Sequence, residues 1–286
     1  MSRLSFGLIL IVGILAGGLG VSLLDRGPAP LGDGEVRGII TEMLQQDKAA
    51  APPQVAELDP DKLNALIDTY LMSDPSILQR MSDKLAEVKR VAAREAQRNL
   101  IQANYKAIYD DAGNVVLGNP NGDVTLVEMF DYNCGYCRGA VPDMAALMAE
   151  DPNLKIILKE FPILSAGSVE AAKVAVLVSE DPKIDYWAFH TELFSTRGQV
   201  GVDAALDAAE ALGGNRVAMM LDMNGKAVAD AIQKSYDLAD ALNVTGTPTY
   251  ILGDEMIPGA VGIDQLRQKI ANLRQCGSTV CDAPAG

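Results

Sequence analysis

Apolar residues fall in two dense runs in the middle of the chain, and a helical pattern separates them. Val124–Phe130 and residues 154–161 read as buried strands, with residues 135–149 as the helix between them. A strand, a helix and a second strand in this order form a βαβ unit, whose two strands are parallel. Pro142 lies inside the predicted helix and is expected to kink it.

Shorter elements surround this unit. A strand is predicted at residues 115–117, and residues 166–243 are almost wholly helical in pattern. Two more strands, at residues 249–252 and 256–257, are separated by a tight turn, and a last helix covers Ile263–Arg274. The pattern therefore predicts an α/β domain with a large helical insertion.

The region before this domain, residues 33–110, is predicted to be a helical arm. Asp59 and Asp74 each precede a proline, which is a typical helix start, and no glycine or proline occurs in residues 76–109. One long helix is therefore expected there. Apolar residues recur along it at spacings of three and four, as in a coiled-coil seam: Leu78, Met81, Leu85, Val88 and Ala92. The seam favours self-association, and the alternative is one amphipathic helix that folds back on its own domain.

The first residues are expected to direct export. Residues 4–24 carry no charge, and a helix of this length spans about 30 Å, the hydrocarbon core of a bilayer. The stretch is longer than the apolar core of most signal peptides and lacks an A-x-A-like cleavage site, which favours a membrane-anchor helix in residues 1–26 over a cleaved signal. Either alternative places the rest of the chain in an oxidising compartment, in a bacterium the periplasm.

Reactive chemistry is predicted where the strand Val124–Phe130 leads into the next helix. Cys134 and Cys137 form a Cys-Gly-Tyr-Cys motif at the start of that helix. Unpaired backbone N–H groups and the partial positive charge of a helix N-terminus both stabilise a thiolate over a thiol. We therefore expect Cys134 to be the exposed nucleophile and Cys137, one turn later, to close or resolve a disulfide.

The same strand carries Glu128, six residues before Cys134. A carboxylate with apolar neighbours should have a raised pKa, and it can pass protons to the resolving Cys137. The alternative is a carboxylate at the frayed end of the strand, paired with a lysine.

The composition of the chain limits the classes of partner that it can bind. The chain has 24 Lys and Arg against 38 Asp and Glu, and this net charge of −14 argues against a nucleic-acid partner.

In the C-terminal tail, residues 276–286, Cys276 and Cys281 are expected to form a local structural disulfide. Their two sulfur atoms and the two of the CxxC motif would together suffice for zinc, but a Cys-x4-Cys spacing is unusual for that metal. We therefore expect no metal and no cofactor.

The other candidate metal ligands have simpler interpretations. His190 is the only histidine and lies among aromatic residues, which favours a structural role. Met219, Met220 and Met223 offer soft ligands for Cu(I), but methionines at helical spacing more often pack in a core.

The order of strand, CxxC, helix, strand, helical block, Thr-Pro, strand pair and helix resembles the thioredoxin fold. The FDYNCGYCR segment and the large insertion are similar to the DsbA-like family of exported thiol–disulfide oxidoreductases, over about residues 112–275. The YLMSDPSIL segment of the arm is similar to the suppressor-of-copper-sensitivity protein C group, where the resemblance implies an oligomerising arm.

The resemblance assigns roles to further residues. It implies that Pro248, preceded by Thr247, is the cis-proline whose loop packs beside the CxxC motif and pairs with a substrate strand. It also implies an acidic residue at the position of Glu128. Gly135 and Tyr136, between the cysteines, tune the thiolate; the oxidase branch typically has Pro-His there, whereas Gly-Tyr and the threonine before the proline are similar to isomerases.

These observations predict an exported thiol–disulfide isomerase or reductase that acts on cysteines of periplasmic proteins. Its dithiol would be kept reduced by a membrane redox partner, and its arm would make a homo-oligomer. The alternatives are a DsbA-type oxidase, a CxxC module that holds copper or zinc, and a chaperone scaffold whose arm matters more than its thiols.

Overall fold

The computed structural model describes Gly38, Thr41 and residues 59–281 of the 286-residue chain. The chain divides into two compact units, which separate between Ile77 and Leu78. The predicted anchor at residues 4–24 lies outside the described residues. Within the residues that the structure describes, no helix is both long and apolar enough to cross a membrane.

Helix α3 (Pro60–Ser73) lies in the first unit and begins as the sequence predicts. Asp59 is its N-cap, and the Asp59 carboxylate accepts a hydrogen bond from the Asp61 N–H at 3.1 Å. Pro60 occupies the first turn, where a missing N–H costs nothing. No residue of α3 is buried, so its apolar side chains face solvent.

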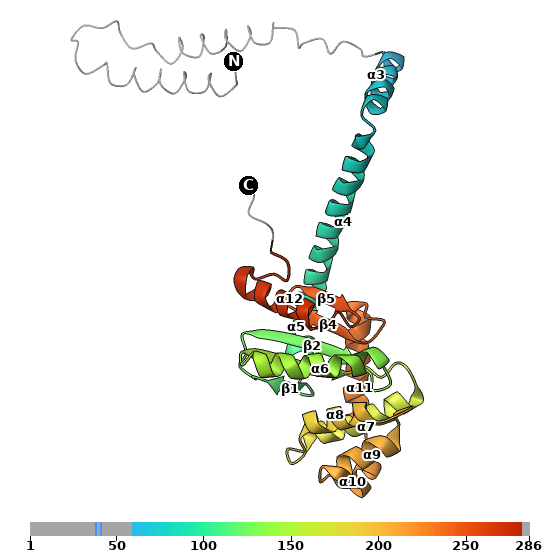
Figure 1. Cartoon of the computed structure of the whole chain (residues 1–286), viewed down its shortest axis with the longest axis vertical. Coiled ribbons are helices and arrows are strands. Elements are labelled where there is room, and N and C mark those ends of the chain that lie inside the picture. The colour runs from blue at the N-terminus through green and yellow to red at the C-terminus, as the bar shows by residue number, and fades with distance from the viewer. Residues whose placement is uncertain (1–37, 39–40, 42–58, 282–286) are drawn as a thin grey trace, which may run out of the picture. The chain divides into compact units, whose positions relative to one another are not determined.

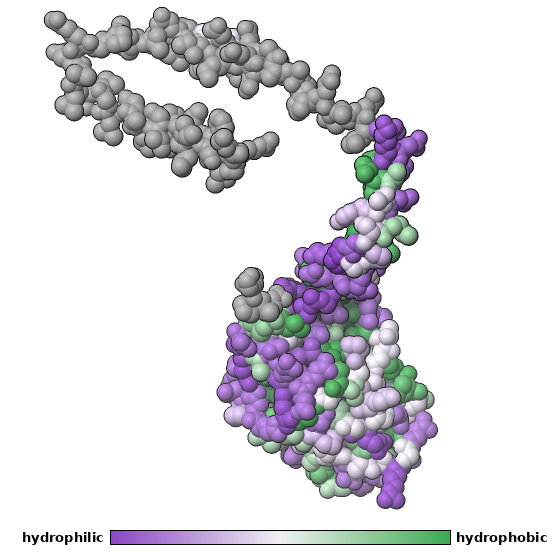
Figure 2. Space-filling model, turned by 45° about the horizontal axis from the view of Figure 1, so that its top comes forward, coloured by the Kyte–Doolittle hydropathy of each residue, from purple (hydrophilic) through white to green (hydrophobic). Residues whose placement is uncertain are grey.

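The long helix predicted up to residue 109 is wrong in one respect, because it is interrupted at Asn104. Helix α4 (Ser76–Ala103) ends there and α5 (Tyr105–Tyr109) begins. The Asn104 side-chain amide donates to the Leu100 carbonyl at 2.9 Å, a local bond of the kind that competes with helix continuation. The predicted seam of α4 is exposed, and apolar and hydrophilic side chains lie side by side on the helix surface (Figure 2).

A five-stranded sheet forms the centre of the second unit. Its strands are β1 (Val115–Gly118), β2 (Val124–Phe130), β3 (Leu154–Glu160), β4 (Thr249–Leu252) and β5 (Glu255–Pro258), in the order β1-β3-β2-β4-β5. Strands β2 and β3 are parallel, as the βαβ pattern predicts, and every other pair is antiparallel. The central β2 is therefore paired on both sides.

Helices cover both faces of this sheet. Alternate residues of β2 point to opposite faces, so Leu126 and Phe130 pack in one core and Val127 and Met129 in another. The first core includes α6 (Gly135–Glu150) and α12 (Ile263–Cys276), and the second includes α5 and α11 (Lys226–Leu242). Helix α6 continues through Pro142.

The helical insertion lies at one end of the sheet (Figure 1). It consists of α7 (Ala166–Glu180), α8 (Tyr186–Ser195), α9 (Val202–Ala211) and α10 (Arg216–Asp222), followed by α11. This arrangement confirms the mixed α/β fold with a large helical insertion.

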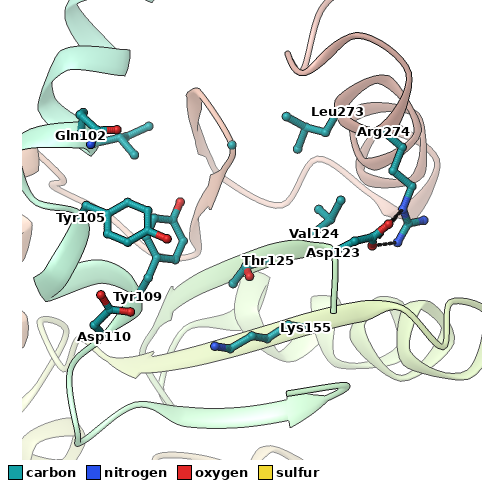
Figure 3. A pocket seen from close by; sticks show the side chains of 12 residues that line it. Gln102, Tyr105, Tyr109, Asp110, Asp123, Val124, Thr125, Lys155, Leu273 and Arg274 are labelled. Atoms are coloured by element: carbon teal, nitrogen blue, oxygen red, sulfur yellow. Dashed lines mark hydrogen bonds and ion pairs between the residues drawn. The ribbon is translucent and has the colours of Figure 1, made fainter. Parts of the chain in front are cut away.

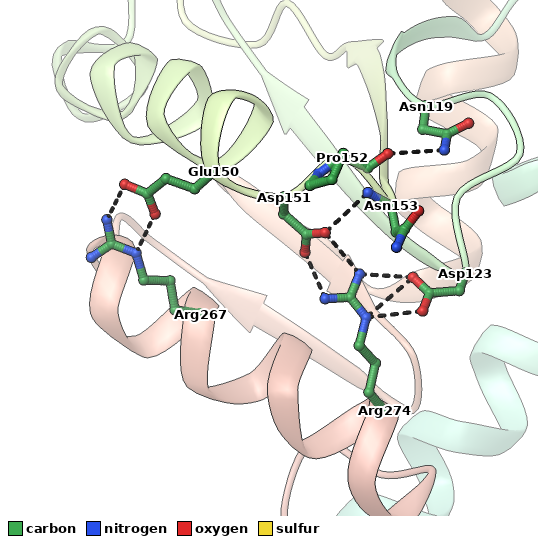
Figure 4. A network of polar contacts seen from close by, with 8 residues as sticks. All are labelled: Asn119, Asp123, Glu150, Asp151, Pro152, Asn153, Arg267 and Arg274. Atoms are coloured by element: carbon green, nitrogen blue, oxygen red, sulfur yellow. Dashed lines mark hydrogen bonds and ion pairs between the residues drawn. The ribbon is translucent and has the colours of Figure 1, made fainter.

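Two arginines of α12 form ion pairs with carboxylates at the end of α6 and just before β2 (Figure 4). Arg267 binds both carboxylate oxygens of Glu150 at the end of α6. Arg274 binds Asp123, just before β2, and Asp151, just after α6. These pairs are partly exposed, so they fix geometry more than they add stability.

The C-terminal segment is closed by a disulfide between Cys276 and Cys281, whose Cα atoms are 5.9 Å apart. Inside this loop, the Thr279 N–H donates to Asp254 in the β4–β5 turn at 3.0 Å. Asp254 also forms an ion pair with Arg98 of α4 at 2.9 Å. One carboxylate thus joins α4, the strand hairpin and the disulfide loop.

Candidate active site

Cys134 is the N-cap of α6, at the end of the central strand. Its Sγ accepts a hydrogen bond from the Cys137 N–H at 3.4 Å, which is the contact that a thiolate at a helix N-terminus needs. Cys134 and Cys137 are both free thiols, so the structure shows the dithiol form.

The expectation that Cys134 is exposed is wrong, because only 5% of the residue is accessible. The loop before β4 covers it: the Cys134 thiol donates to the Thr247 carbonyl at 3.2 Å. The Thr247–Pro248 peptide bond in this loop is cis. The structure therefore brings together the cysteine and the Thr-Pro pair, which lie more than a hundred residues apart in the sequence.

Gly135 and Tyr136 supply the exposed part of the motif. Tyr136 is 74% exposed, and a Cβ added at Gly135 would meet no atom within 4 Å. The dipeptide between the cysteines thus faces solvent, where a substrate would meet it.

Cys137 and Glu128 form the buried side of the site. Burial raises the pKa of the Cys137 thiol far above its usual value, and the negative charge of Glu128 raises it further. Glu128 is 3% exposed and lies opposite Leu158 and Tyr250 in the sheet. Burial raises the pKa of Glu128 to about 8. The site therefore places a thiol whose raised pKa disfavours the thiolate beside a carboxyl group that exchanges protons near neutral pH.

The three residues before Cys134 belong to the site as well, and the sequence patterns do not predict their role. Asp131, Tyr132 and Asn133 connect the nucleophile loop to the rest of the domain. The Asn133 side chain accepts from the Val200 N–H at 2.7 Å and donates to the Val200 carbonyl at 2.9 Å, just before α9. A polar triplet between an apolar strand and a cysteine was the available signal.

Tyr132 begins a buried polar network. Its hydroxyl lies 3.3 Å from His190 Nδ1 and 3.3 Å from the Tyr186 hydroxyl, which donates to Glu160 at 2.9 Å. Burial lowers the pKa of His190 to about 3, so this histidine is neutral. Burial raises the pKa of Glu160 to about 8, so the site region contains a second buried acid that the sequence does not predict.

The other candidate ligands do not converge. Met219 and Met223 are buried, whereas Met220 is exposed. Among the described residues, no group of three or more His, Cys, Asp or Glu side chains is placed to hold a metal ion. Cys276 and Cys281 are bonded to each other and so offer no thiolates in this state.

A groove of about 620 Å³ lies near the start of β2, at the end of the strand away from Cys134 (Figure 3). Tyr105, Tyr109 and Lys155 line it. It contains none of the residues predicted for the site, so the dithiol chemistry takes place elsewhere.

A dithiol at the mouth of a helix, a cis-proline loop against the first sulfur and a buried acid beneath the second define a thiol–disulfide exchange site of the thioredoxin type. Comparison with known proteins agrees. The chain belongs to the DSBA-like thioredoxin domain family, which matches residues 125–271. Residues 125–271 are therefore a thioredoxin-like domain of the DsbA type.

Solved structures support this membership. A thioredoxin-like oxidoreductase from Silicibacter pomeroyi DSS-3 is 36% identical and superposes with a TM-score of 0.57, covering 60% of this chain and 98% of that one. The catalytic domain of Proteus mirabilis ScsC is 27% identical, with a TM-score of 0.54, over 59% of this chain and 94% of that domain.

Two curated relatives each match 55% of the chain. Disulfide bond formation protein D of Bacillus subtilis is 24% identical over 168 residues, which is 55% of this chain and 76% of that protein. The chain spans only about a quarter of Na(+)/H(+) antiporter NhaA 1 of Salinispora arenicola, at 24% identity over 162 residues.

Proposed function

We propose that the protein is an exported disulfide isomerase or reductase that acts on cysteines of periplasmic proteins. The observation that carries the proposal is the contrast between the two thiols. The Cys134 Sγ atom accepts a hydrogen bond from a backbone N–H at the N-terminus of α6. Cys137, in contrast, is buried near Glu128, and its pKa is strongly raised.

The first step is the same for both activities. The Cys134 thiolate attacks one sulfur of a substrate disulfide, and a Cys134–substrate bond forms as the substrate bond breaks. The second substrate sulfur leaves as a thiolate. The exposed Tyr136 and the Thr247–Pro248 loop flank this mixed disulfide.

The raised pKa of Cys137 then decides the outcome. While Cys137 keeps its proton, a different thiolate of the same substrate can attack the substrate sulfur of the mixed disulfide. A new substrate disulfide forms, the Cys134 thiolate is released, and there is no net change in electrons. When Glu128 accepts the proton, the Cys137 thiolate attacks Cys134 instead. The substrate then leaves reduced, and the enzyme disulfide needs two electrons from a membrane reductase.

The Gly-Tyr dipeptide and the threonine before Pro248 favour this activity over a DsbA-type oxidase. Residues 4–24 would hold the protein at the periplasmic face of the inner membrane, or direct export before cleavage. An isomerase also needs its dithiol reduced in an oxidising compartment, so a membrane redox partner is part of the proposal.

The exposed seam of α4 supports self-association. Leu78, Met81, Leu85 and Val88 are each more than half exposed on one helix, at coiled-coil spacing. A second copy is the partner that such a seam fits. Several active sites around one misfolded chain would raise the effective concentration of thiolate.

The test combines refolding of scrambled ribonuclease with alkylation trapping of the Cys134–Cys137 pair in cells. We expect the wild type to recover ribonuclease activity and to be mainly reduced, and Cys134→Ala to be inactive. A mainly oxidised pair, with faster oxidation of reduced ribonuclease, would assign a disulfide donor. Stoichiometric bound metal without thiol exchange would assign a metal-holding module, and an unchanged phenotype of Cys134→Ala a chaperone scaffold.

A further inference from the structure

A cavity of about 800 Å³ lies beside the last residues of β3. Residues of α5, α7, α8 and α11 line it together with β3, whereas neither cysteine of the dithiol nor Pro248 is among its lining residues. Four of the lining residues are alanines, whose short side chains leave the cavity unfilled: Ala107, Ala175, Ala227 and Ala231. The cavity is therefore a candidate ligand site that is separate from the dithiol.

Glu160 is the buried acid of this cavity. It is one of the lining residues and is only 8% exposed. Its Oε1 atom accepts a hydrogen bond from the Tyr186 hydroxyl at 2.9 Å, whereas its Oε2 atom has no hydrogen-bond partner within the described part of the chain. A buried polar atom without a partner costs free energy, unless a water molecule, an ion or a ligand supplies one. The Oε2 atom thus lacks a donor that a ligand can provide.

The charge of the lining residues favours a cation as this ligand. Five of them are acidic and two are lysines, and an excess of negative charge attracts cations. Lys234 is paired with Asp111 at 3.3 Å. The buried Lys159 donates to the Ala107 carbonyl at 2.9 Å and to Asn114 at 2.6 Å. Both lysines are therefore engaged within the fold and leave the acidic residues in excess.

An organic cation fits better than a metal ion. Among the described residues, no group of three or more His, Cys, Asp or Glu side chains is placed to hold a metal. A primary ammonium group carries three N–H donors and no acceptor, which matches a carboxylate oxygen that lacks a donor. A hydrogen bond between two charged groups is also roughly twice as strong as one between neutral groups.

We propose that this cavity binds a small aliphatic primary amine, whose ammonium group donates to Glu160 and whose alkyl chain packs against the alanines. The alanines offer apolar surface for methylene groups, and the carboxylate fixes the charged end of the ligand. The site uses neither thiol, so the inference is independent of the proposed function.

The protonation of Glu160 gives this site a specific signature. Burial raises the pKa of Glu160 to about 8. The hydroxyls of Tyr186 and Tyr132 oppose this rise, and the charge of Asp131 adds to it. Glu160 is therefore mostly protonated at pH 7, and an ammonium ion must displace that proton, while the amine itself stays charged up to about pH 10. Affinity should rise roughly tenfold between pH 6 and pH 7 and level off above pH 8.

Isothermal titration calorimetry of the full-length protein with butylamine tests the site. The control ligand is 1-butanol, which has the same alkyl chain without the charge. We expect butylamine to bind at one site per chain, more tightly than 1-butanol and with the pH dependence given above. Titrations at pH 7 in buffers of different ionisation enthalpy should show the release of close to one proton for each amine bound.

Variants of the buried acid test its role. Glu160→Gln keeps the size of the side chain and removes its charge, so it should weaken butylamine binding at pH 8 by roughly tenfold or more and abolish the pH dependence. Glu192→Gln, at an exposed acid of α8, also removes one negative charge and should change the affinity by less than about twofold.

A second pair of variants keeps the test valid if Glu160→Gln does not fold. Ala231→Phe places a ring at a lining position of α11 and should weaken butylamine binding, whereas Ala229→Phe, at an exposed position of the same helix outside the lining, should not. The inference is wrong if butylamine binds no more tightly than 1-butanol, or if Ala231→Phe binds it as the wild type does. It is also wrong if no proton is released at pH 7, because the ammonium group would then lie away from Glu160. Thiol exchange takes no part in these measurements, so either result leaves the proposed function standing.

Discussion

Replacing Glu128 with glutamine removes the charge of the buried acid and keeps its size. Folding raises the pKa of Glu128 from 4.5 to about 8, because burial disfavours the charged form. Below pH 4.5 both folded and unfolded chains hold the proton. As the pH rises toward 8, only the unfolded chain releases it, so wild-type stability is lost across this interval.

The size of this loss of stability follows from the difference between the two pKa values. At about 1.36 kcal/mol per pKa unit, the rise of the Glu128 pKa from 4.5 to about 8 corresponds to a loss of about 5 kcal/mol. By the same relation, about 3 to 4 kcal/mol of this loss falls between pH 5 and pH 8. Glutamine does not titrate, so Glu128→Gln should gain on the wild type by this amount over the range.

Urea unfolding of both reduced proteins at pH 5, 6, 7 and 8 measures the difference. Glu160 titrates in both proteins and cancels, and Glu180→Gln, at an exposed glutamate, controls for the loss of one negative charge. In rapid-mixing experiments the same variant should accumulate mixed disulfide, because Cys137 loses its proton acceptor. Parallel pH profiles for wild type and Glu128→Gln would refute the argument.

Other predictions concern the tail, the arm and the histidine. Serine at both Cys276 and Cys281 should lower the free energy of unfolding by about 2 kcal/mol, because the closed loop is short, and leave disulfide exchange intact; a loss of exchange would contradict a purely structural disulfide. Leu85→Asp should reduce the mass measured by sedimentation, whereas Leu221→Asp, on an exposed helix outside the arm, should not; equal masses would argue against the seam. His190→Gln should leave the activity profile between pH 5 and 8 unchanged in shape, since burial lowers the pKa of His190 to about 3, and a lost inflection near pH 6.5 would disprove this.

The sequence predicts best where local signals decide the structure. The apolar run of β2, the CxxC motif and the helix that follows are adjacent in the chain, so their arrangement follows from strand and helix patterns alone. The strand pair near the C-terminus is marked in the same way, by alternation around a turn at Gly253.

The features that the sequence does not predict depend on tertiary burial. Asp131 and Glu160 look like ordinary surface acids, and only the folded chain shows that both are buried. The covered position of Cys134 depends on a loop more than a hundred residues away. An asparagine at position 104 is also compatible with a continuous helix, and only the folded chain shows that its side chain donates to the carbonyl of Leu100 in the preceding turn.

The ion pair between Arg98 and Asp254 has a mechanical consequence. Asp254 lies in the turn of the hairpin whose first strand, β4, starts at Thr249, directly after Pro248. The ion pair therefore attaches α4 to the hairpin that starts directly after the proline loop. A continuous set of contacts thus runs from Arg98 of α4 through this hairpin to the loop whose Thr247 carbonyl accepts the Cys134 thiol.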